Sequence, residues 1–402
     1  MAFDPSKVRS DFPILAQAVN GKPLVYLDNA ATTQKPLAVL DASRRYYEEI
    51  NANIHRGTHH LARAATAAHE AARDRVARHL NASESAEVIF TSGATDSINL
   101  VAAILTLVPG DEVLVSALEH HSNIVPWQML CERSGASLKV IPCHEDGTLD
   151  QDAFRALLSE RTRLTAFTWI SNAFGTVNPV REMCAAAKAA GSLVLVDAAQ
   201  AIPHVRIDVR ELDADFLVFS GHKVYAPTGI GVLWGRRSVL DALPPWRGGG
   251  EMIKEVTFER STYNVLPFKY EAGTPNIEGA IALAAALDYI EGIGLEAIAA
   301  HEQHLIRRAA EGLSALTDLR LFGPDDRVGA LSFGIHGVHH YDLGTLIDQM
   351  GVAVRTGHHC CQPLMARFGV TGTTRASFAL YNTEAEVDTL IAAVEKALVM
   401  LR

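Results

Sequence analysis

Two adjacent cysteines, Cys360 and Cys361, follow two histidines in the segment RTGHHCCQP (355–363) of a chain with only five cysteines. Thiols in such a setting serve a metal site, a redox pair or a nucleophile. A bridge between sequence neighbours would strain the backbone, so we do not expect a structural disulfide. The choice among the three depends on which other reactive side chains the fold brings to these thiols.

A lysine stands among small and polar residues in SGHKVYAPTGIG (220–231), directly after the apolar run DFLVFS (215–220). An exposed lysine whose stem lies along the surface is the ordinary interpretation. If Lys223 is desolvated, its amine is a nucleophile that can form a Schiff base. Ser220 and His222 would then add hydrogen-bond donors for a phosphate.

Other polar segments also follow apolar runs. TSGATDS (91–97) opens a helix whose first N–H groups could bind a phosphate, although a plain N-cap fits equally well. EHHSN (119–123), SNAFG (171–175) and Asp197 are each typical of structural residues when taken singly. Together, a phosphate turn, the planar ring of His120, a carboxylate and a lysine amine match the requirements of pyridoxal phosphate.

Short apolar runs alternate with alanine-rich helical segments over the first two thirds of the chain. Strands without polar alternation, separated by helices, predict a mostly parallel sheet covered on both faces. Ligands of such sheets bind beyond the carboxyl ends of the strands, where the polar segments above are placed. The expected strands span 87–90, 112–116, 138–141, 164–170, 193–197, 215–220 and 231–234.

The pattern changes near residue 277, where a long helical stretch begins. We expect a large cofactor-binding domain over 25–276 and a smaller C-terminal α/β domain over 277–402 that carries Cys360. Residues 1–24 are expected to pack with the smaller domain. Its expected strands span 330–335, 352–357 and 375–382.

The bulk composition excludes several classes of protein. The formal charge is −10 without a basic stripe, which argues against a nucleic-acid partner. The longest apolar stretches, 101–108 and 280–287, are too short to span a bilayer, and the N-terminus lacks the apolar core of a signal peptide. Few and odd-numbered cysteines favour the reducing cytoplasm.

With these segments in order, the chain resembles the fold-type I, class V aminotransferase-like enzymes. Within them it is similar to the group II cysteine desulfurases of the SUF iron–sulfur system. The resemblance covers nearly the whole chain and implies an α/β fold with a mostly parallel seven-stranded sheet and a smaller C-terminal domain. It rests on residues 26–36, 53–62, 119–128, 171–180, 196–204, 220–231, 271–276, 354–360 and 375–382.

The resemblance implies a role for each site residue. Lys223 binds the pyridoxal phosphate aldehyde and moves protons at the substrate Cα, and His120 stacks on the ring. Asp197 pairs with the pyridine nitrogen, Gln200 bonds the ring 3-oxygen, and Asn172 and Arg375 orient the substrate carboxylate with Arg355 at the same mouth. The phosphate is held by Ala94, Thr95, Ser220 and His222, together with Thr274 from a partner subunit of a homodimer.

Cys360 matches the family's nucleophile. The resemblance implies that its thiolate attacks the sulfur of L-cysteine, yielding alanine and a Cys360 persulfide that passes to an acceptor protein of the SUF system. Cys361 departs from the family, which more often has a small residue there. An inert side chain, a second sulfur acceptor and an oxidation-sensitive thiol remain open, and the first predicts that Cys361→Ala leaves turnover nearly intact.

The same residues also suggest functions other than that of a cysteine desulfurase. We expect no metal, because consecutive His and Cys residues rarely all reach one ion, and Gly57 spoils a helical pairing of His55 with His59. A selenocysteine lyase or another class V aminotransferase or lyase would share the cofactor site, although an aminotransferase has no use for Cys360. A non-enzymatic scaffold would not need Lys223, Asp197, His120 and Cys360 together.

Overall fold

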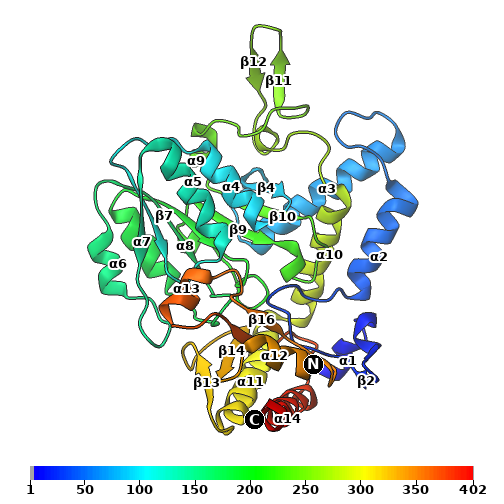
Figure 1. Cartoon of the computed structure of the whole chain (residues 1–402). Helices are drawn as coiled ribbons and strands as arrows, with labels where there is room; N and C mark the ends of the chain where they lie inside the picture. The colour runs from blue at the N-terminus through cyan, green and yellow to red at the C-terminus, as the bar shows by residue number, and fades with distance from the viewer. Residues whose placement is uncertain (1–3, 402) are drawn as a thin grey trace.

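The protein consists of a larger body built on a seven-stranded sheet and a smaller body built on a four-stranded sheet. The computed structural model describes residues 4–401. In Figure 1 the smaller body, with α11, α12 and α14, lies below the larger one, and a hairpin projects from the opposite end. That hairpin pairs β11 (Ile253–Val256) with β12 (Ser261–Tyr263).

The large sheet confirms the predicted strands. Its order is β4-β10-β9-β8-β7-β5-β6; β10 runs antiparallel to β4 and β9, and the other neighbours are parallel. A mostly parallel seven-stranded sheet is therefore confirmed. The strands are β4 (Val88–Thr91), β5 (Glu112–Ser116), β6 (Ser137–Ile141), β7 (Thr162–Thr168), β8 (Leu193–Asp197), β9 (Phe216–Ser220) and β10 (Gly231–Gly235).

Helices cover both faces of this sheet, which explains why its strands read as continuous apolar runs. Along β9, Leu217 and Phe219 enter one apolar core while Phe216 and Val218 enter the other. The first core also contains residues of α3 (His60–His79), α7 (Val180–Ala189) and α10 (Ile277–Ile293). The second contains residues of α4 (Ala94–Ile104) and α5 (Val125–Ser134).

Shorter helices complete the larger body and the N-terminal segment. They are α1 (Pro5–Arg9), α2 (Leu37–Arg45), α6 (Gln151–Leu157), α8 (Val209–Leu212) and α9 (Arg237–Ala242), and a two-stranded ribbon pairs β1 (Ala18–Val19) with β2 (Lys22–Pro23). Helices α1 and α2 precede the first strand of the large sheet, α6 and α8 lie between consecutive strands, and α9 follows the last strand.

The smaller body packs its helices on a sheet of order β13-β14-β17-β16. Leu305 of α11, Leu343 of α12 and Leu390 of α14 share a core with Phe333 of β14, whereas Leu364 and Met365 of α13 pack in the first core of the larger body. The elements are α11 (Leu295–Ser314), β13 (Leu319–Phe322), β14 (Ala330–Ile335), α12 (His340–Asp348), β16 (Arg355–Gly357), α13 (Gln362–Arg367), β17 (Thr373–Ser377) and α14 (Glu384–Leu401).

Two expected strands differ from the structure. The run 352–357 is two strands, because β15 (Val352–Ala353) pairs with β3 (Val25–Tyr26) whereas β16 pairs with β17. The run 375–382 leaves the sheet after Ser377, because the amide of Ala379 donates to Oδ1 of Asn382 in a turn. Local sequence patterns carry no information about these changes of pairing partner.

The domain boundaries at residues 24/25 and 276/277 stay predictions, and two elements cross them. Val25 and Leu27 lie in the core of the smaller body through the β3–β15 pairing. Helix α10 packs in the core of the larger body although it begins at residue 277.

Within the N-terminal segment, of which residues 1–3 lie outside the described part, Arg9 pairs with Glu386 of α14 at 2.9 Å. Among residues 4–401, no helix is both long enough and apolar enough to cross a bilayer.

The two bodies meet backbone to backbone at Gly175, which has φ +72°. A Cβ there would lie 2.6 Å from the Ala330 carbonyl oxygen and 2.7 Å from that of Val328. We expect Gly175→Ala to lower the free energy of unfolding by about 2–4 kcal/mol, from left-handed strain plus overpacking. The matched control is Gly191→Ala, where φ is +80° but no atom lies within 4 Å of the added carbon. Denaturant melts of both variants measure the difference; equal losses would contradict it.

Candidate active site

A cavity of about 180 Å³ opens where the carboxyl ends of the central strands of the large sheet meet the smaller body. Strands β8 and β9 end at Asp197 and Ser220, and the smaller body contributes residues from β16, β17 and the loop before α13. All but two of the predicted site residues line this cavity. They are Ala94, Thr95, His120, Asn172, Asp197, Ser220, His222, Lys223, Arg355, Cys360 and Arg375.

Asp197 and Lys223 form the charged centre of the cavity. Asp197 is 5% exposed, and its Oδ1 accepts the amide of Ala199 at 2.9 Å. Burial raises the pKa of Asp197, and the nearby Lys223 ammonium opposes that shift. Burial lowers the pKa of Lys223, although its side chain keeps some solvent contact where it faces the cavity. A lysine in this state is closer to the neutral amine that attacks a carbonyl.

The backbone turn that carries Lys223 is braced by the segment TTQK (32–35). The His222 carbonyl accepts the Thr33 amide at 3.0 Å and the Lys35 ammonium at 3.3 Å, and both Thr32 and Thr33 hydroxyls also reach it. Burial lowers the pKa of Lys35 to about 8. No role for this segment was predicted from the sequence, because its partner lies nearly 190 residues away.

His120 presents a neutral imidazole to the cavity. The Ser122 amide donates to its Nδ1 at 3.1 Å, so in the neutral ring the proton lies on Nε2. Burial first, and then the charge of Lys223, lowers the pKa of His120 to about 3. An uncharged, half-buried ring of this kind can cover a planar ligand and donate through Nε2.

The residues predicted to bind the phosphate lie around the N-terminus of α4. Its N-cap, Gly93, has no side-chain cap, and the Ala94 amide donates to the Ser220 hydroxyl at 2.8 Å. Burial and the neighbouring Lys223 lower the pKa of His222 to about 4. Helix N–H groups, hydroxyls and a neutral imidazole make a donor set that fits a phosphate.

A buried arginine lies at the opposite side of the cavity. Arg375 is 2% exposed; its Nη1 donates to the Asn172 carbonyl at 2.7 Å and its Nη2 to Asp28 Oδ1 at 3.2 Å. Its Nε has no partner among the described residues, so the guanidinium can still bind an anion. Arg355, more exposed, lies 3.7 Å from Asp28 Oδ2. Asp28 was not among the predicted site residues, although it is the one carboxylate within residues 26–36.

The adjacent thiols face different surroundings. Cys360 lines the cavity, whereas Cys361 is fully buried and donates from Sγ to Asn172 Oδ1 at 3.2 Å. Burial raises the pKa of Cys361 to about 12, which keeps it a thiol at neutral pH. Because the thiolate is the reactive form, Cys360 is the candidate nucleophile and Cys361 is a packed side chain beneath it.

We expect Cys361→Ala to retain turnover within about threefold of the unsubstituted enzyme. It removes one weak S–H donor, but Asn172 stays fixed because its Nδ2 still donates to the His359 carbonyl at 2.7 Å. Steady-state alanine formation from L-cysteine checks this. Cys361→Ser, which keeps a donor, should lie closer still to the unsubstituted rate. Loss of most turnover in both variants would mean that this thiol takes part in sulfur transfer.

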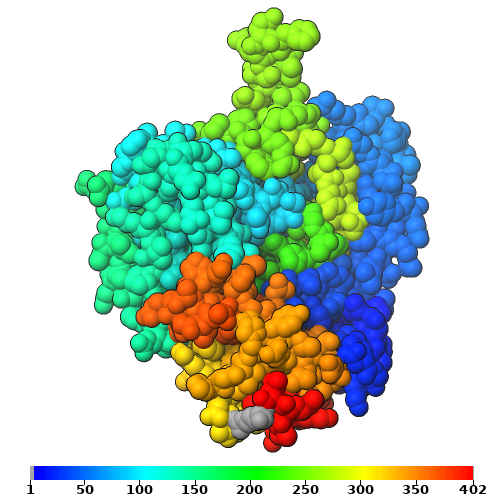
Figure 2. Space-filling view, viewed as in Figure 1, coloured from blue at the N-terminus to red at the C-terminus, as the bar shows by residue number. Residues whose placement is uncertain are grey.

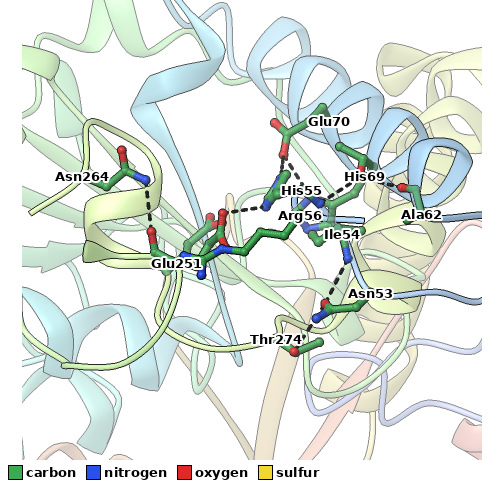
Figure 3. Close-up of polar contacts among 12 residues, drawn as sticks. Asn53, Ile54, His55, Arg56, Ala62, His69, Glu70, Glu251, Asn264 and Thr274 are labelled. Atoms are coloured by element: carbon green, nitrogen blue, oxygen red, sulfur yellow. Dashed lines mark hydrogen bonds and ion pairs between the residues drawn. The ribbon is translucent and has the colours of Figure 1, made fainter. Parts of the chain in front are cut away.

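Gln200 and Thr274 do not line the cavity. Gln200 is buried beside it and donates from Nε2 to the Ala30 carbonyl at 2.7 Å. Thr274 lies in separate hollows on the larger body, with its hydroxyl 3.4 Å from Asn53 Oδ1 (Figure 3). Thr274 therefore lies outside the cavity of its own chain. The contact implied for it, with the phosphate in a partner subunit, stays a prediction.

Near Thr274, the atoms His55 Nε2, His69 Nδ1 and Glu70 Oε1 lie within 4.8 Å of one another and could hold a metal ion. The Glu70 carboxylate is already bonded to both imidazoles, at 2.9 and 3.2 Å, and to Arg73 at 3.0 Å (Figure 3 shows Glu70 with His55 and His69). A guanidinium beside the carboxylate disfavours a cation, so we interpret the group as a hydrogen-bonded network. His59, whose spacing from His55 suggested a possible metal pair, instead caps α3, because its Nδ1 accepts the Ala62 amide.

Comparison with known proteins agrees with this site. The family model "Aminotransferase class-V" matches residues 25–390. A probable cysteine desulfurase of Vibrio cholerae is 50% identical over 404 residues and is covered completely, as is this chain. The crystal structure of the cysteine desulfurase CsdA from Escherichia coli, in its S-sulfonic acid form, superposes with a TM-score of 0.93 at 42% identity over 100% of both chains. That of Thermococcus onnurineus cysteine desulfurase gives 0.93 at 38% identity, over 98% of this chain and 99% of the other.

The chain belongs to the class-V aminotransferase family, and within it to the homologues of cysteine desulfurases. The predicted fold-type I architecture and the predicted enzyme class, cysteine desulfurase, are confirmed at this level. The roles predicted for the single site residues, and the assignment to the SUF group, stay predictions.

Proposed function

We propose that this cysteine desulfurase, a pyridoxal phosphate enzyme, converts L-cysteine to L-alanine and leaves a persulfide on Cys360. The observation that carries the proposal is that Cys360 of the smaller body and Lys223 of the larger body line the same cavity. A lysine amine alone would suit many reactions, but the added thiol suits sulfur transfer.

The cavity fits the cofactor by its chemistry. Asp197 offers a buried carboxylate, Lys223 a desolvated amine and His120 a flat neutral ring, while the α4 N-terminus with Ser220 offers donors for a phosphate. When bound, pyridoxal phosphate supplies an electron sink that stabilises negative charge at the substrate Cα. The protein then provides orientation and proton transfer.

Different side chains bind the substrate, transfer its protons and attack its sulfur. Arg375, with its unpartnered Nε, binds the carboxylate of L-cysteine and turns the side chain towards the Cys360 loop. Lys223 takes the Cα proton and later returns protons to the carbon skeleton. The Cys360 thiolate attacks the substrate sulfur, so that an S–S bond forms as the Cβ–S bond breaks. The electron pair of the broken bond stays with carbon, which is protonated and leaves as alanine.

We further propose that the persulfide supplies iron–sulfur cluster assembly through an acceptor protein of the SUF system, in the cytoplasm. The support is the resemblance to group II desulfurases and the position of Cys360 at the edge of the cavity, where a half-buried sulfur can be reached. The matched Escherichia coli structure carries the name CsdA, so sulfur-transfer assays with candidate acceptor proteins, those of the SUF system included, must decide the physiological route.

A homodimer is part of the proposal. Thr274 lies in surface hollows away from the cavity of its own chain, as a residue that serves a second copy would. The hairpin that projects from the surface in Figure 2 bears exposed Phe258, with Val256 and Tyr263 more than half exposed. Apolar side chains on such an extension favour burial against another protein surface. Sedimentation of the purified protein tests the dimer.

The decisive experiment incubates the enzyme with L-cysteine, quantifies alanine, and locates the persulfide by mass spectrometry. We expect a persulfide on Cys360 in the unsubstituted enzyme and in Cys361→Ser, and neither persulfide nor rapid alanine formation in Cys360→Ser. Retained cofactor absorbance in Cys360→Ser shows that the fold is intact. Normal turnover in that variant would remove the thiol from the mechanism and redirect attention to other β- or α-carbon reactions.

A further inference from the structure

The loop that carries Cys360 is attached to the larger body through His121. This residue begins the short 3-10 helix His121–Asn123, next to the cavity residue His120. Its backbone amide donates to the Cys360 carbonyl at 2.7 Å. Its side-chain Nε2 accepts the amide of Gln362 at 3.0 Å, across 241 residues of sequence. One residue therefore holds the nucleophile and the position two residues beyond it.

The loop needs such attachment because its backbone is strained. His359 and Cys360 have φ of +52° and +56°, so two successive residues other than glycine lie in the left-handed region. Such conformations persist only where surrounding contacts over-determine them. Asn172 and Thr373 hold His359 at 2.7 and 2.8 Å, ahead of the nucleophile. His121 contacts the backbone of Cys360 itself and that of Gln362, while the Cys361 side chain between them bonds to Asn172.

The accepted amide also needs a partner from outside its own helix. Gln362 is the first residue of α13, and the N-cap, Cys361, provides no side-chain cap. First-turn amides have no acceptor within a helix, so Nε2 of His121 takes the place of the missing cap. Because Nε2 accepts, the neutral ring carries its proton on Nδ1. Burial, and then the neighbouring His358, lowers the pKa of His121, which favours this neutral acceptor form.

We propose that His121 is a positioning residue whose Nε2 acceptor keeps the Cys360 thiol at the cavity. Without that acceptor, the loop relaxes from its left-handed conformation and carries the thiol away from the substrate sulfur. The inference rests on the proposed function, since it concerns delivery of that nucleophile. The role proposed for His121 differs from that of its neighbour His120, which lines the cavity where the cofactor is proposed to bind.

The test compares three substitutions in the cofactor-loaded enzyme. His121→Gln places an oxygen near the position of Nε2, whereas His121→Asn places it near Nδ1 and His121→Ala removes the side chain. Each variant receives two measurements: the rate of Cys360 alkylation by iodoacetamide without substrate, followed by mass spectrometry, and kcat and KM for alanine formation. Cofactor absorbance and a thermal melt confirm an intact fold.

We expect His121→Ala and His121→Asn to alkylate about tenfold faster and to lose about tenfold in kcat, with KM within about twofold. His121→Gln should restore both quantities to within about threefold. If His121→Ala does not fold, the contrast between Asn and Gln decides alone.

Two results would overturn the proposal. One is an unchanged alkylation rate, even with reduced kcat, because the effect would then arise at His120. The other is failure of Gln to differ from Asn. If the unsubstituted enzyme forms no alanine or persulfide, the proposed function is wrong, but the alkylation rates still decide whether His121 holds the loop.

Discussion

Lys223→Ala is expected to lower alanine formation from L-cysteine by about a thousandfold or more. The variant loses the amine that we propose bonds the cofactor and transfers protons at Cα, and positioned acid–base groups contribute about 10²–10⁴-fold. Lys223 is the lysine that lines the cavity, and burial has already lowered its pKa towards the reactive neutral amine. Initial rates of alanine formation and the visible absorbance of the bound cofactor measure the loss.

The control for this substitution is Lys396→Ala, at an exposed position of α14 far along the chain. It should keep both rate and absorbance. A small primary amine added to Lys223→Ala should recover part of the activity, since it replaces the missing base without restoring the covalent anchor. Turnover of Lys223→Ala within tenfold of the unsubstituted enzyme would contradict the role assigned to this lysine.

Arg375→Lys is expected to raise the KM for L-cysteine by about 10–100-fold. Lysine keeps the charge but not the planar fork, and a hydrogen bond to a charged group contributes about 1.5–3 kcal/mol. The fork already uses Nη1 and Nη2 on Asn172 and Asp28, so the shorter ammonium cannot keep these contacts and also reach the substrate. Saturation curves for alanine formation measure KM and kcat separately.

Arg355→Lys is the matched control. Its side chain is 45% exposed and pairs with the same Asp28 at 3.7 Å, and exposed pairs contribute about 0–1 kcal/mol. We therefore expect a change in KM below about fivefold. If both substitutions raised KM equally, we would conclude that Arg355 and Arg375 bind the carboxylate of L-cysteine together. The buried guanidinium of Arg375 would then not be its main binding group.

Much of the large sheet was predictable because most of its strands contain short buried apolar runs, although the edge strand β6 is more exposed. Burial on both faces requires such runs, and each predicted run contains or overlaps a strand of the sheet. The smaller body was less predictable. The break between β15 and β16 follows from pairing with β3, more than 300 residues away, and no local pattern reports a distant partner.

The chemistry of the site could be read along the chain: a lysine amine, a carboxylate and a flat imidazole at the ends of apolar strands, and a thiol in a histidine-rich segment. Side-chain chemistry and strand periodicity are local properties, so they can be read along the chain. Only the tertiary structure decided which thiol faces the cavity and which is buried, how Asp28 pairs with both arginines, and why His121 reaches the Cys360 loop. These depend on the docking of two bodies, because burial and hydrogen bonding between distant segments arise only when they pack together.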